Sequence, residues 1–137
     1  MAEMRLVQVG DVRLAYRESG PDPAAPVVLL HALGEDSSDW DGVAAALSQT
    51  CHVYAVDLRG HGRSGWPGRY SLPLLRDDVA RFLDALGLGQ VTLIGHSIGG
   101  AVAYLLAMRH PERVKRMVLE EPAPPWPAIP RCPRVRA

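Results

Sequence analysis

The sequence has little of several features that would assign it to a specialised class of protein. Its 15 basic and 15 acidic residues cancel, so no cationic excess is available to neutralise a nucleic-acid backbone. No apolar run approaches the roughly 18 residues of a membrane span. The 47% hydrophobic and 22% charged residues are typical of a folded domain and not of a disordered chain. We therefore expect one globular domain that binds neither nucleic acid nor membrane.

Cysteine is scarce as well. Cys51 and Cys132 are the only two in the 137 residues, too few for a disulfide framework. No metal-ligand spacing surrounds them, so we expect neither a metal nor another cofactor. Residues 1–5 have no apolar segment of the kind found in signal peptides. Together these features predict a cytoplasmic protein.

Short apolar runs alternate with amphipathic segments along the chain. Residues 6–9 and 12–16 predict a hairpin around Gly10 and Asp11. Further strands are expected at residues 27–30, 52–56, 91–94 and 114–119, and helices at 40–47, 71–86 and 98–110. This alternation predicts an α/β fold, with a mainly parallel sheet, helices on both faces and the first two strands antiparallel.

The composition changes at Pro122, which is the first of six prolines within 12 residues. Their density excludes a helix or a central strand. We therefore predict a domain over residues 1–121, followed by an extended or disordered tail rich in proline and arginine over residues 122–137.

The segment from Gly95 to Gly99 reads G-H-S-I-G and lies between a predicted strand and an alanine-rich helix. This is the setting of a nucleophile elbow, in which a sharp turn presents the serine side chain. Such a turn strains Ser97, so its neighbours two residues away must lack side chains. We expect Ser97 to be the nucleophile and the Ile98 N–H to be an oxyanion donor. The alternative is a glycine-rich turn with an incidental serine.

Two earlier loops complete a pattern. Residues 31–34 read H-A-L-G after one buried strand, and residues 57–65 read D-L-R-G-H-G-R-S-G after the next. With the Ser97 motif in this order and spacing, residues 6–122 resemble the α/β-hydrolase fold family, of the type that has a serine nucleophile. The G-x-G-x-x-G within residues 60–65 opens no helix, so we do not interpret it as a dinucleotide site.

The resemblance implies a role for each motif residue. Leu33 would supply the second oxyanion N–H, while His31 and Gly34 shape its loop. Ala32 stands where the family usually has glycine, and a positive φ there would strain it. Gly95, His96 and Gly99 would form the elbow. Asp57 and Arg59 would be hydrogen-bonding or ion-pair partners in a structural loop.

The catalytic base is the missing part. The family order is serine, acid, histidine, and the only histidine after Ser97 is His110. It lies about 20 Å along the following helix, beyond the reach of proton transfer. Glu121 is a candidate acid after the sixth strand, the alternative being a surface carboxylate. The sequence therefore predicts an α/β-hydrolase core truncated after its sixth strand, whose open edge favours self-association.

The resemblance and the serine together imply an esterase-like hydrolase of a small carboxylic ester or related acyl compound. We expect this chain to hydrolyse activated esters poorly or not at all. Members with aspartate as nucleophile, the dehalogenases and epoxide hydrolases, fit poorly. Two alternatives stay open. One is an inactive remnant or binding module, and the other is a cofactor-free haloperoxidase-like or C–C hydrolase on the same scaffold.

Overall fold

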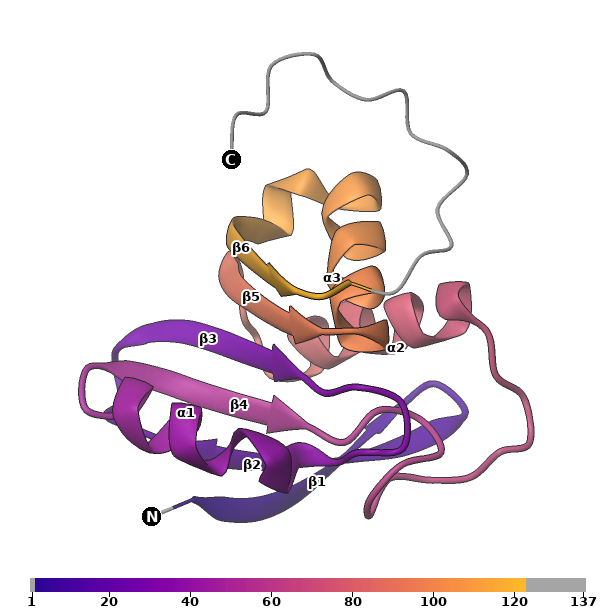
Figure 1. The fold of residues 1–137 in the computed structure, drawn as a ribbon, viewed down its shortest axis with the longest axis horizontal. Helices are drawn as coiled ribbons and strands as arrows, with labels where there is room; N and C mark the ends of the chain where they lie inside the picture. Colours follow the sequence, from indigo (N-terminus) through magenta and orange to yellow (C-terminus); the bar gives the residue numbers. More distant parts are fainter. Residues whose placement is uncertain (1, 123–137) are drawn as a thin grey trace.

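A computed structural model describes residues 2–122 (Figure 1). Every expected strand and helix is present. The strands are β1 (Glu3–Val9), β2 (Val12–Ser19), β3 (Ala25–Leu30), β4 (Cys51–Val56), β5 (Val91–His96) and β6 (Val114–Glu120). The helices are α1 (Asp41–Leu47), α2 (Leu72–Ala85) and α3 (Ile98–Arg109), with short 3₁₀ turns at Ser37–Trp40 and Pro111–Arg113. Apart from Pro122, the tail predicted over residues 122–137 lies outside the described residues.

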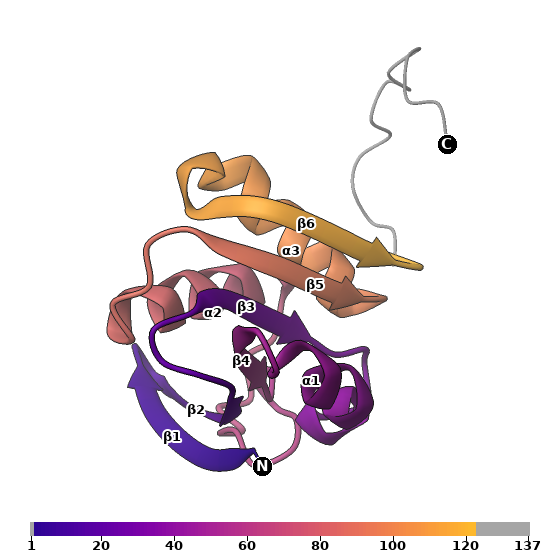
Figure 2. The same ribbon diagram turned by 90° about the vertical axis from the view of Figure 1, so that its left-hand side faces the viewer.

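The six strands form one sheet in the order β1-β2-β4-β3-β5-β6. The β1–β2 and β2–β4 pairs are antiparallel, whereas β3 pairs in parallel with both β4 and β5, and β5 with β6. The sheet is therefore mainly parallel with an antiparallel N-terminal hairpin, as the sequence predicts. Figure 2 shows β1 and β6 at opposite edges of the sheet.

Helices cover both faces of the sheet, and the central strands are apolar on both sides for that reason. Val28 and Leu30 of β3 face the core that α2 and α3 close, while Val27 and Leu29 face the smaller core beneath α1. All four side chains are at most 5% exposed. Figure 1 shows α1 on its own side, apart from α2 and α3.

The two helices that flank the candidate site have clear sequence signals. The Ser71 hydroxyl accepts a 3.2 Å hydrogen bond from the Leu74 N–H at the start of α2, and Gly87, with φ of 65°, follows its end. The sequence predicts Val43, Ala44 and Leu47 on one apolar face of α1, and this prediction is wrong for Val43. Val43 is 42% exposed, because in this short helix Ala44 and Leu47 face the sheet and Val43 points away from it.

No helix in the described part of the chain is long and apolar enough to cross a membrane.

Candidate active site

Ser97 lies at the junction of β5 and α3 in a strained backbone conformation. Its φ of 52° and ψ of −115° lie outside the regions that L-residues favour. The glycines around it are required by close approach. A Cβ on Gly95 would collide with the backbone of Gly99, and a Cβ on Gly99 would collide with the carbonyl of Leu30. Gly95 and Gly99 therefore lack room for a side chain, as the elbow motif predicts.

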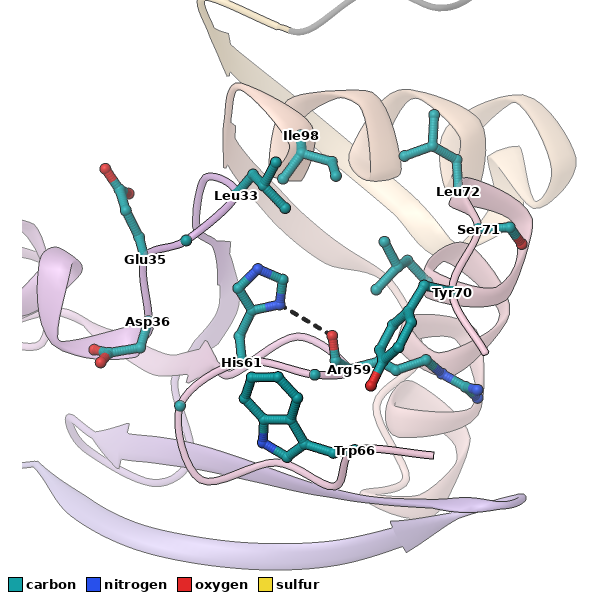
Figure 3. Close-up of a pocket in the computed structure, with 14 residues that line it drawn as sticks. Leu33, Glu35, Asp36, Arg59, His61, Trp66, Tyr70, Ser71, Leu72 and Ile98 are labelled. Carbon is teal, nitrogen blue, oxygen red and sulfur yellow. Dashed lines mark hydrogen bonds between the residues drawn. The ribbon is translucent and has the colours of Figure 1, made fainter. Parts of the chain in front are cut away.

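The end of α3 next to Ser97 and the loop after β3 meet at one cavity. Ile98 is the first residue of α3, where backbone N–H groups have no intrahelical partner. Leu33, 71% exposed, comes from the loop after β3, and both side chains line a cavity of about 620 Å³. Figure 3 shows them side by side at one end of it. The structure thus brings together the two residues expected to form the oxyanion hole.

The loop that carries Leu33 has a single left-handed position, and it is Gly34, with φ of 78°. Ala32 does not have a positive φ, so the strain considered for an alanine at this place does not arise. The loop closes on itself, because the Glu35 N–H donates to the Ala32 carbonyl at 3.1 Å. The alanine is therefore compatible with a normal loop conformation.

His31 is fully buried and holds two loops together. The Leu58 N–H donates to its Nε2 at 2.9 Å, so the ring proton sits on Nδ1, which donates to the Ala32 carbonyl at 2.7 Å. Burial lowers the pKa of this imidazole. With both nitrogens engaged inside the protein, His31 organises the loops and has no lone pair to offer a substrate.

Asp57 is buried at the end of β4 and accepts hydrogen bonds from two loops. The Ser37 N–H donates to Oδ1 at 2.7 Å and the Arg63 N–H to Oδ2 at 3.0 Å. A Cβ on Gly62 would lie 2.5 Å from Oδ2 of this carboxylate, so that glycine is required. Asp57 is therefore a structural carboxylate, as the sequence suggests.

Arg59 forms the buried ion pair expected of it. Its side chain has no solvent exposure and bonds Asp78 of α2 through Nε at 2.7 Å and Nη2 at 2.8 Å. Nη2 also bonds Asp11 at 2.7 Å. These carboxylates raise the pKa of the guanidinium further above its usual value. The network connects the β1–β2 turn, the glycine-rich loop and α2, and so fixes one wall of the cavity.

Other residues of the cavity were missed by sequence reasoning. His61 is one of the lining residues and lies between Leu33 and Trp66 in Figure 3, with Nδ1 hydrogen-bonded to the Arg59 carbonyl at 3.0 Å. Trp66 and Tyr70, 73% and 48% exposed, stand beside it. The sequence did offer one signal for this part of the cavity. Both aromatic residues lie in a loop to which neither helix nor strand periodicity assigns a structure. With Leu33, Leu72 and Ile98 they make most of the cavity wall apolar.

In the part of the chain that the structure describes, no base is hydrogen-bonded to the Ser97 hydroxyl. Among residues 2–122, no histidine hydrogen bonds its hydroxyl, and the remaining three rings have other partners. His52 bonds Glu18 at 2.8 Å, His96 lies 3.7 Å from Glu35, and His110 lies 3.5 Å from Glu112.

The proposed acid, Glu121, follows the last residue of β6. Its φ of 40° makes it, with Ser97, one of two described non-glycine residues with a positive φ. The Ser97 N–H donates to the carbonyl of Glu120 at 2.9 Å, so the end of β6 and the elbow are adjacent. The catalytic role of the Glu121 carboxylate stays a prediction.

Comparison with known proteins agrees with this geometry. The family model described as alpha/beta hydrolase fold matches residues 25–137. The chain therefore belongs to the α/β-hydrolase fold family.

Individual relatives are similar over most of the chain. It is 37% identical over 135 residues to a putative carbamate hydrolase, RutD, of Caulobacter vibrioides, covering 94% of this chain and 50% of that protein. It is 39% identical to a pimeloyl-[acyl-carrier protein] methyl ester esterase of Aeromonas hydrophila, covering 86% and 46%.

A crystal structure of a membrane phospholipase A, a bacterial virulence factor, superposes with a TM-score of 0.88 at 35% identity, covering 93% of this chain and 42% of that one. The chain spans about half of the length of the two curated relatives named above, 50% of one and 46% of the other.

Proposed function

We propose that this chain carries the nucleophile and oxyanion-hole part of a serine hydrolase that acts on a small carboxylic ester or related acyl compound. The observation that carries the proposal is the strained Ser97, held at a strand–helix junction by two glycines that no larger residue could replace. Backbone strain at a polar residue is characteristic of functional positions, and the next residue, Ile98, lines the cavity. The relatives named as an esterase and a carbamate hydrolase support an acyl substrate.

In the proposed reaction, Ser97 Oγ forms a bond to the substrate carbonyl carbon and its proton passes to a base. The carbonyl π electrons move to oxygen, where negative charge collects. The backbone N–H groups of Ile98 and Leu33 would donate to that oxygen. The positive end of the α3 dipole stabilises the same charge. When the intermediate collapses, the bond to the leaving oxygen breaks and that oxygen takes the proton from the base, so that an alcohol departs and an acyl-serine remains. Water then hydrolyses the acyl-serine and releases the acid.

The cavity supports a substrate with an apolar portion. Its apolar and aromatic lining residues are Leu33, Trp66, Tyr70, Leu72 and Ile98. Contact with these walls would remove apolar surface of the substrate from water, which is the main source of affinity in such sites. A cytoplasmic setting is part of the proposal, on the ground that Cys51 is a free thiol.

Labelling with an alkyl fluorophosphonate tests the proposal. Its phosphorus forms a bond to an activated serine oxygen and fluoride leaves, which adds a fixed mass. We expect slow labelling at Ser97, faster with an octyl than with a methyl reagent, and none in Ser97→Ala. Ser38→Ala, which changes an exposed serine, should label normally. Labelling that is equal in Ser97→Ala, or absent under all conditions, would refute the proposal.

An inactive binding module is the second candidate, because the described residues lack a base at Ser97. It predicts that the octyl reagent binds reversibly in the cavity, without mass addition, and that Trp66→Ala weakens this binding. The labelling experiment separates the two candidates. The C–C hydrolase alternative would use the same serine, and no contact in the described site favours it over an esterase.

A further inference from the structure

β6 is an edge strand whose outer side is open in the described part of the chain. Val118 of this strand is 53% exposed, and Arg116 and Glu120, two residues away on either side, are exposed as well. Among residues 2–122, neither of these two charges has an ion-pair partner. The opposite edge is different, since Arg5 of β1 already pairs with Glu3 at 2.8 Å and Glu18 at 2.7 Å.

The regular part of this edge is short and well defined. Val91 pairs with Val114 and Thr92 with Arg116, so Lys115 is a bulge at one end. At the other end, Glu121 leaves the strand with a φ of 40°. The segment that could accept a new strand is therefore residues 116–120, and Val118 is its midpoint.

The backbone fixes which residues can bond across this edge. The Glu120 carbonyl accepts from the Ser97 N–H on the β5 side. Because backbone groups alternate in direction along a strand, those of Arg116 and Val118 also face β5. The N–H and C=O groups of Met117 and Leu119 therefore face outward.

We propose that the β6 edge binds a second copy of this chain, in an antiparallel two-fold pair centred on Val118. In this register Met117 of one copy lies opposite Leu119 of the other, and the outward groups of both form four backbone hydrogen bonds. Val118 faces its own counterpart at a non-hydrogen-bonded position, where side chains come closest. Arg116 lies opposite Glu120 twice. The result is a two-fold contact that closes on itself.

Neighbouring registers lack this match. A pair centred on Met117 would set Arg116 opposite Val118, and a pair centred on Leu119 would set Val118 opposite Glu120. A shift by one residue would bring outward backbone groups against inward ones. Only the Val118 register gives both charges an opposite charge and buries the exposed valine against another valine. The edge is thus complementary to itself in charge, in backbone direction and in apolar contact. This self-complementarity identifies a second copy of the chain as the occupant.

Engineered cysteines test the register, in a Cys51→Ser, Cys132→Ser background of the full chain. Under mild oxidation, Val118→Cys should form a disulfide-linked dimer efficiently. Leu6→Cys is the matched control, because Leu6 is also 53% exposed on an edge strand, and it should remain largely monomeric. Met117→Cys should also fail to cross-link. Equal cross-linking of the three variants would overturn the proposal.

Charge reversal tests the same contact without cysteines, by sedimentation velocity at several concentrations. Arg116→Glu should weaken dimerisation by about tenfold or more, because like charges then face each other twice. Glu120→Arg should do the same, and the double reversal should restore the dimer. A chain that is monomeric at high micromolar concentration, or a double reversal that stays as weak as either single variant, would overturn the proposal. Circular dichroism of each variant excludes misfolding as the cause.

Discussion

Gly99 of α3 lies against the main chain of Leu30 so closely that a Cβ on the glycine would collide with the Leu30 carbonyl oxygen. This contact brings the N-terminus of α3 against the end of β3, and so places the Ser97 elbow beside the loop that carries Leu33. The two halves of the candidate oxyanion hole thus depend on one glycine.

Gly99→Ala should therefore destabilise the fold by about 3 kcal/mol or more, since the obstacle is backbone and cannot move aside. Gly42→Ala is the matched control. Gly42 also lies in a helix, but a Cβ there meets no atom within 4 Å, so the change should be neutral or stabilising by up to about 1 kcal/mol. Urea denaturation measures both. A Gly99→Ala variant as stable as Gly42→Ala would show that the helix can shift away from β3.

The buried pair of Arg59 and Asp78 should be costly to break. Both side chains are at most 2% exposed. Asp78→Ala would leave a buried guanidinium with the half-exposed Asp11 as its only carboxylate partner, beside the Arg69 carbonyl. We expect a loss of about 3–5 kcal/mol in unfolding free energy. Asp11→Ala removes the other carboxylate, whose side chain is 53% exposed, and should cost much less because water replaces it. Equal losses in the two variants would contradict this ranking.

The sequence predicts the order of strands and helices and the Ser97 elbow well, because both rest on local patterns. Buried strands read as apolar runs, and the glycines around Ser97 report backbone crowding directly. Side-chain partners from distant segments were not predictable in the same way. Asp78 lies on an amphipathic helix, where an acidic residue normally faces water, and only the packing of α2 against the glycine-rich loop brings it to Arg59. His61 is placed in the cavity by loop geometry that has no periodic signature.

Acid should weaken the fold through His31. Burial holds its pKa below the usual value of 6.5, so the unfolded chain takes up a proton more readily than the folded one. The stability associated with the neutral ring is complete above pH 6.5 and decreases as the pH falls below it. His31→Gln should be less stable overall but lose less stability between pH 7 and pH 5. Urea denaturation across this range provides the test, and identical slopes for His31→Gln and the wild-type chain would rule the mechanism out.

Exogenous imidazole should accelerate the reaction of Ser97 with an octyl fluorophosphonate. None of the five histidines hydrogen bonds the Ser97 hydroxyl in residues 2–122, so a small diffusible base can take the place of the absent side chain and accept the serine proton. The labelling rate should rise with the concentration of neutral imidazole and decrease when acid protonates it. N-methylimidazole, also a base, should act similarly, whereas imidazolium at low pH should have no effect. Ser97→Ala measures the background reaction of imidazole with the reagent. An imidazole-independent rate in the wild-type chain would mean that a base already reaches Ser97 and that the assignment of the five histidines is wrong.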